Sequence, residues 1–103
     1  MIKVSLLYAA EEGKKFDMDY YANKHIPLVH QRLDPEGLIR SEVESGISSA
    51  DPNAPPPFVA IGVFYFNTAD EVHEGFKTHG REIMGDLPNF TNIEPQVQIS
   101  EIQ

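Results

Sequence analysis

The sequence contains no cysteine. Disulfide bonds, thiolate nucleophiles and cysteine-ligated metals are therefore excluded. Because proteins of a reducing compartment do without disulfides, this absence fits a cytoplasmic protein, and we expect that location. The first residues read directly as a strand, without the charged and apolar regions of a signal peptide, so we expect no secretory signal.

Positive charge is scarce. The chain has 8 Lys and Arg residues but 16 Asp and Glu residues, which gives a formal net charge of -8. Nucleic acids and anionic membrane surfaces are themselves negative, so this balance speaks against both as partners. No apolar run approaches the roughly 18 residues of a membrane-spanning helix. The acidic residues are spread along the chain and indicate solvated faces.

Motifs for metals, phosphates and acyl transfer are also missing: there is no zinc-ligand spacing, no glycine-rich phosphate loop and no Gly-x-Ser-x-Gly elbow. Asp70, His73 and Glu74 superficially resemble a metal set, but the pattern of their helix places them on its outer, solvated face. His25 and His30 diverge by roughly 140° around a helix and cannot share a metal. We expect neither a metal nor another cofactor.

The apolar pattern predicts one domain, residues 1–103, with four strands. Alternation predicts strands over Ile2–Tyr8, over Leu38–Ile47 and from Val97 to Ile102, and an unbroken apolar run predicts another over Phe58–Phe66.

Two helices complete the pattern, one after Asp17 and one after Asn67-Thr68. The order β-α-β-β-α-β is that of an α+β ferredoxin-like sandwich. The four prolines within Ser48–Pro57 predict a stiff, exposed arm whose role the sequence leaves open.

The Phe58–Phe66 strand is apolar on both faces. A sheet with helices on one side normally has one polar face, and this chain has no third layer to cover the other side. A second copy, packed sheet against sheet, would cover it, so we expect a homodimer. The alternative is a central strand that is simply rich in β-forming residues.

A histidine lies on the apolar side of the first predicted helix, in the segment Phe16–Val29. Asp17 is a good N-cap for this helix. Residues three and four apart share one face of a helix, and here that face carries Met18, Tyr21, His25, Leu28 and Arg32. Because Pro27 lacks a backbone donor, we expect a kink just after His25. Burial beside apolar residues should lower the pKa of the histidine.

His25 is the first candidate catalytic residue, since imidazole titrates near neutral pH, and Tyr21 would orient the ring or the ligand. The alternative is a buried histidine that only holds the kink. Tyr8 and Tyr65 could present hydroxyls to a ligand, but ordinary core packing with the hydroxyl at the edge is the favoured alternative, and the same holds for Tyr21. We assign substrate binding to Tyr8, Tyr65 and Leu28, in a mostly apolar cleft between the sheet and the first helix. Arg40 is more simply a solvated residue of an edge strand.

The chain resembles the EthD family of the dimeric α+β barrel superfamily. The resemblance rests on the opening strand IKVSLLY, on FDMDYYANKHIPLV and on DLPNFTNIEPQVQISEI. The residues that match the family pattern are Asp17, Tyr20, Tyr21, His25, Pro27, Leu28, Asp86, Pro88, Asn89, Phe90 and Thr91.

This resemblance implies a dimeric barrel and a small hydrophobic or aromatic ligand. The family is named for a protein encoded with an oxygenase system that degrades ethyl tert-butyl ether, and its members are loosely described as oxidoreductases. The resemblance to this family also implies cofactor-independent oxidoreductase, decarboxylase or isomerase chemistry assisted by His25. The alternative is a non-catalytic dimeric carrier or accessory protein for a partner oxygenase. Family membership fixes the fold far better than the reaction.

Overall fold

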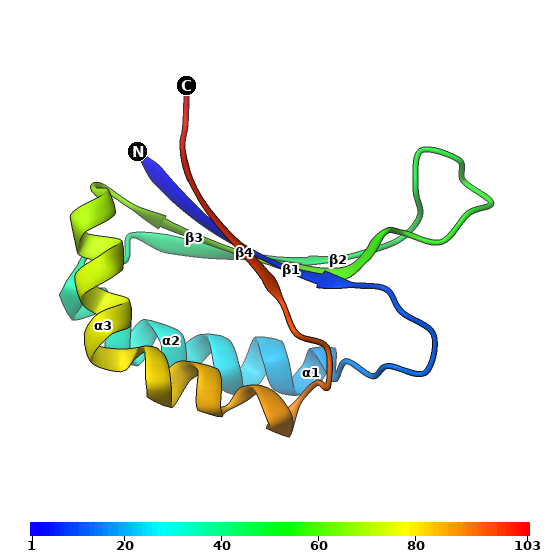
Figure 1. Cartoon of the computed structure of the whole chain (residues 1–103), viewed down its shortest axis with the longest axis horizontal. Helices are drawn as coiled ribbons and strands as arrows, with labels where there is room; N and C mark the ends of the chain where they lie inside the picture. The colour runs from blue at the N-terminus through cyan, green and yellow to red at the C-terminus, as the bar shows by residue number, and fades with distance from the viewer.

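The computed structural model describes residues 1–103 as one antiparallel sheet with helices on a single face (Figure 1). The strands are β1 (Ile2–Ala9), β2 (Arg40–Ser45), β3 (Phe58–Phe66) and β4 (Gln96–Glu101), in the spatial order β2-β3-β1-β4. Helices α1 (Met18–Tyr20) and α2 (Ile26–Leu33) precede β2, and α3 (Ala69–Gly85) precedes β4. This topology confirms the predicted ferredoxin-like β-α-β-β-α-β fold. No helix is long and apolar enough to cross a membrane.

The first helical segment runs from α1 to α2 through a π-helical turn, Tyr21–His25. Asp17 caps its start, because its Oδ1 accepts from the Tyr20 backbone N–H at 3.1 Å. The backbone N–H of Ile26 bonds to the carbonyl of Tyr21, five residues back. Pro27 follows directly. Its ring has no N–H and disfavours a regular turn before it, which accounts for the wider turn. The predicted irregularity is present and lies before Pro27.

Helix α3 begins with a capping box. The Thr68 hydroxyl accepts from the Glu71 backbone N–H at 3.2 Å, and the Glu71 carboxylate accepts from the Thr68 backbone N–H at 3.1 Å. The helix bends midway, so its two halves cover the sheet from different directions (Figure 1). Val72 and Ile83 are its buried apolar contacts.

The hydrophobic core fills the space between the helices and one face of the sheet. On β1, every second side chain from Ile2 to Tyr8 is buried against the helices, as the alternating pattern predicted. Strand β3 supplies Phe64 and Phe66 to the same core. An aromatic cluster closes one end of this core and is made of Tyr8, Phe16, Tyr20, Tyr21 and Phe90.

The other face of the sheet carries no helix (Figure 1). We call it the open face. The strand register puts its side chains in three rows across the sheet. They are Arg40, Tyr65, Lys3 and Ser100; then Glu42, Val63, Ser5 and Gln98; then Glu44, Ile61, Leu7 and Gln96. Strand β3 is thus apolar on both faces, as predicted, and polar side chains of β2 and β4 flank its apolar residues.

The proline-rich segment Ser48–Pro57 is an arm that projects beyond the end of β2 and β3 (Figure 1). It contains no strand. The Ser49 N–H bonds to the carbonyl of Ala54 at 3.2 Å, and the Gly46 N–H bonds to the carbonyl of Val59 at 2.9 Å below the arm. Prolines exclude ladder pairing here, which agrees with the predicted arm.

Candidate functional site

His25 is enclosed by protein, with 2% of its surface exposed. It stacks on Tyr21, with ring centroids 5.5 Å apart and planes 17° from parallel. Phe90 packs on it at 4.7 Å between centroids. The ring therefore lies in an apolar, aromatic setting at the end of the π-helical turn, where its orientation is fixed.

Asp86 is the polar partner of His25 and was missed by the sequence reasoning. The His25 Nδ1 lies 2.9 Å from Asp86 Oδ2. The Tyr20 hydroxyl and the Asn89 side-chain amide both donate to Asp86 Oδ1, each at 2.8 Å. Asp86 is the C-cap residue of α3. Through these hydrogen bonds the Asp86 carboxylate links the first helical segment to the end of α3. The only sequence signal for it was its place among the residues that match the family pattern.

The π-helical turn explains how Tyr20 and His25 reach the same carboxylate. Residues five apart diverge by roughly 140° in an α-helix. In a π-helical turn the hydrogen bonds join residues five apart, so their side chains lie nearly one above the other. The irregular geometry therefore brings Tyr20 and His25 to one side, facing Asp86.

Burial sets the charge of this pair. Burial lowers the pKa of His25 below the usual 6.5, and the hydrogen bond and charge of Asp86 offset this only in part. The direction agrees with the sequence-based expectation. For Asp86, burial acts to raise the pKa, but hydrogen bonds from Asn89, His25 and Tyr20 outweigh it, so the pKa lies below 3.8. At neutral pH a neutral imidazole donates from Nδ1 to a carboxylate, which leaves Nε2 as a hydrogen-bond acceptor.

The phenols of Tyr8 and Tyr21 are buried, with 0% and 1% of their surfaces exposed, and neither hydroxyl has a hydrogen-bond partner. Burial is the main cause that raises the pKa of Tyr8 to about 12 and raises the pKa of Tyr21 as well. Both therefore stay protonated at neutral pH. Their packing among aromatic rings supports a structural role for both residues.

The predicted cleft beside His25 is absent. Neither cavity of the chain is lined by His25, Tyr21 or Leu28. The aromatic rings around the histidine fill the space in which a ligand was expected. Leu28 is half-buried on α2, outside both cavities. The assignment of His25 and Tyr21 as catalytic stays a prediction.

Tyr8 and Tyr65 lie on opposite faces of the sheet and cannot line one cleft within a chain. Tyr8 belongs to the helix-covered core, whereas the Tyr65 hydroxyl donates to Glu42 Oε1 at 3.0 Å on the open face. The Arg40 guanidinium carbon lies 3.9 Å from the Tyr65 ring centroid, and Arg40 is paired with Glu42. The sequence correctly predicted a strand for each residue, but the two side chains point to opposite faces of the sheet, so the expected shared cleft is not formed within one chain.

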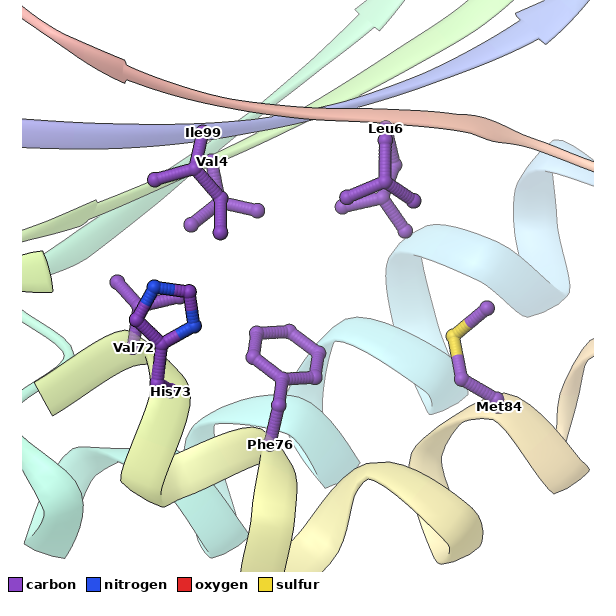
Figure 2. Close-up of a pocket in the computed structure, with 8 residues that line it drawn as sticks. Val4, Leu6, Val72, His73, Phe76, Met84 and Ile99 are labelled. Atoms are coloured by element: carbon purple, nitrogen blue, oxygen red, sulfur yellow. The ribbon is translucent and has the colours of Figure 1, made fainter. Parts of the chain in front are cut away.

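An apolar cavity lies elsewhere, between α3 and the strands β1 and β4 (Figure 2). Its volume is about 310 Å³. It is bounded by Val4, Leu6, Val72, His73, Phe76, Met84, Val97 and Ile99. Three of these residues are large apolar side chains with substantial exposure: Met84 at 36%, Val97 at 55% and Ile99 at 40%.

His73 is the one polar residue at this cavity. In Figure 2 its ring points from α3 toward the strands, beside Phe76. The sequence pattern had placed His73 on the outer, solvated face. It is exposed, but the bend of α3 and the free edge at β4 put it at the rim of the cavity, which helical periodicity alone does not reveal.

A second cavity of about 330 Å³ lies between the Ala10–Phe16 connection and the base of the arm, at Pro55 and Val59. Its walls mix lysine, glutamate and apolar side chains. No group of three or more His, Asp or Glu side chains is arranged to hold a metal ion.

The chain resembles several proteins of known structure. An EthD-like protein from Ralstonia eutropha JMP134 is 40% identical, with a TM-score of 0.92 over 97% of this chain and 89% of the other. An EthD family protein from Bacillus halodurans C-125 is 20% identical, with a TM-score of 0.68 over 100% and 99% of the two chains. A dimeric ferredoxin-like protein from an uncultured marine organism is 14% identical, with a TM-score of 0.63 over 99% and 94%.

The last two similarities, at 20% and 14% identity, show the fold alone. No protein of curated function matches this chain. The EthD domain matches residues 11–94, which include both the π-helical turn and Asp86. Together with the 40% identity over almost the whole chain, this match shows that the protein belongs to the EthD domain family.

Proposed function

We propose that this chain binds a small apolar or aromatic molecule in the cavity between α3 and strands β1 and β4. The observation that carries the proposal is the cavity itself, about 310 Å³ in volume with seven hydrophobic residues among the eight that line it. Binding sites for small molecules are typically concave, mostly apolar and provided with few polar groups. A ligand here would cover Met84, Val97 and Ile99, which are otherwise exposed to water.

Binding of naphthalene, measured by its fluorescence, tests this proposal. Val97→Glu places a charge in the cavity wall and should abolish binding. Val43→Glu is the matched control, because Val43 also lies on an edge strand, on the same face of the sheet and 36% exposed, but does not line the cavity. Equal loss of affinity in both variants, or no binding by the wild-type chain, would rule out this cavity as the site.

We further propose that the chain is a homodimer packed through its open face. Leu7, Ile61 and Val63 form an apolar centre there, and the charged and amide side chains of β2 and β4 form a polar rim, which is the usual anatomy of an interface. The basic residues Lys3 and Arg40 share one row, and acidic side chains occupy the others. A two-fold axis parallel to these rows, through the middle one, would bring the basic row of one copy against the Glu44 row of its partner.

The second candidate function is acid–base catalysis by His25. It is favoured by the hydrogen-bonding of the ring, because Asp86 holds Nδ1 while Nε2 makes no hydrogen bond within the chain. A substrate proton transferred to Nε2 would leave an imidazolium paired with the Asp86 carboxylate. A ligand would have to reach Nε2 through the aromatic residues that enclose it.

Access to His25 separates the two candidates. Diethyl pyrocarbonate acylates accessible imidazole nitrogens, and mass mapping at pH 7 resolves the four histidines of the chain. Acylation of His25 at a rate near that of exposed His73 would support catalysis. Protection of His25 throughout, with His73 modified, would leave binding as the function and His25 as a structural residue.

A further inference from the structure

We propose that His73 supplies the single polar contact of the apolar cavity and selects an aromatic ligand of about two fused rings that carries one neutral hydroxyl or carbonyl group. This inference rests on the proposed binding function and names its ligand class. It concerns a residue outside the His25–Asp86 pair.

The volume of the cavity sets the size of the ligand. A cavity of about 150 Å³ lined by Leu, Ile and Phe side chains holds a benzene molecule. The cavity beside α3 is about 310 Å³, or roughly twice that volume, which suits two fused rings. Its length runs along α3, with His73 near one end and Met84 near the other (Figure 2).

The side chain of His73 is free to bind. His30 uses both ring nitrogens on neighbouring side chains, Nδ1 on Asp34 at 2.8 Å and Nε2 on Ser41 at 2.7 Å. His73 makes no hydrogen bond or ion pair in the structure, and its ring points toward the strands across the cavity (Figure 2). Imidazole donates a hydrogen bond in either protonation state and accepts one when neutral. A hydroxyl or a carbonyl can therefore pair with it.

The rest of the cavity restricts where that polar group can lie. The other lining side chains are hydrophobic, so a ligand hydroxyl placed among them would lose its hydrogen bonds to water without replacement. The first turns of α3 also carry Asp70, Glu71 and Glu74. Their negative charge disfavours a ligand carboxylate beside His73, which leaves a neutral polar group.

Paired titrations with naphthalene and 2-naphthol test this assignment, and the quantity measured is the ratio of their dissociation constants. The ratio of the naphthalene dissociation constant to the 2-naphthol dissociation constant should be about tenfold larger for the wild-type chain than for His73→Phe. Phenylalanine keeps the aromatic bulk of the histidine but removes the hydrogen bond. His73→Gln, which can still donate, should retain most of the preference. His79→Phe is the control on the same helix, since His79 does not line the cavity.

An unchanged ratio in His73→Phe would overturn the assignment of His73 while leaving the binding function intact. A loss of the preference in His79→Phe as well would overturn it too. If the wild-type chain bound neither compound, the proposed function would fail and this inference with it. The His73 ring nitrogens, followed by NMR, should shift when 2-naphthol is added and stay unchanged with naphthalene.

Discussion

The hydroxyl oxygen of Tyr21 occupies the space that a Cβ atom at Gly62 would fill. Strand β3 can pass beneath the tyrosine ring only because position 62 has no side chain. Gly62→Ala should therefore destabilise the fold by about 1–3 kcal/mol, the usual range for overpacking a core. Urea unfolding followed by circular dichroism measures the change.

Two further variants sharpen this test. Gly85→Ala, at a helical glycine with nothing within 4 Å of an added Cβ, should be neutral or stabilising, by up to about 1 kcal/mol. Tyr21→Phe removes the overlapping oxygen, so the double variant should lose less stability than the two single changes added together. Strict additivity would mean that another contact limits position 62.

The lowered pKa of His25 makes stability depend on pH. The unfolded chain binds a proton near pH 6.5, whereas the folded chain binds it only at lower pH. The stabilisation is therefore complete above pH 6.5 and is lost as the pH falls toward the folded pKa, by at most about 1.4 kcal/mol per pH unit. His25→Gln should remove this slope. The same slope in the variant would assign it to another group. Protonation of Asp86 adds a separate loss below pH 3.8.

Loss of Asp86 should affect two structural elements at once. Asp86→Ala leaves Tyr20, His25 and Asn89 without their shared acceptor, so we expect a loss of about 2–3 kcal/mol in unfolding free energy. The pKa of His25 should fall further, because burial remains and the carboxylate is gone. NMR titration of the His25 ring measures it. Asn89→Ala removes only one donor to Asp86 and should lower the unfolding free energy by less than Asp86→Ala does. A His25 pKa that is unchanged or raised in Asp86→Ala would contradict the pairing of His25 with Asp86.

The homodimer predicts a mass of twice the 11.6 kDa chain by light scattering at micromolar concentration. Ile61→Glu buries a charge at the centre of the open face and should leave only monomer. Val43→Glu should remain dimeric, since Val43 lies on the opposite face of the sheet. A wild-type chain that stays at 11.6 kDa would overturn the dimer.

Local sequence patterns predicted the strands, both helix starts and the arm, because each depends on neighbouring residues. Asp17 as an N-cap and the alternation of β1 needed no knowledge of distant contacts. Local sequence patterns could not predict that Asp86 is the hydrogen-bond partner of His25. Asp86 lies 61 residues away, and only the packing of the end of α3 against the π-helical turn brings the two together.

Whether a cleft adjoins His25 could not be predicted from the sequence for a related reason. Periodicity marked the side of the first helix that carries His25 as inward, which is correct, but it cannot show whether aromatic rings fill the space in front of the histidine. It correctly placed His73 on the solvent-exposed face, but a helical wheel contains neither the bend of α3 nor the free edge at β4, so it could not show that His73 also borders a cavity. Burial and cavity shape depend on all layers of the fold together.

The π-helical turn also constrains the length of the chain. It is equivalent to one extra residue within an α-helix. A relative one residue shorter between Tyr20 and His25 would place these side chains four apart, on the same face of a regular helix, and would keep both at Asp86. One additional residue would turn them away from each other. Homologous chains should therefore tolerate a deletion here, together with loss of Pro27, and should reject an insertion.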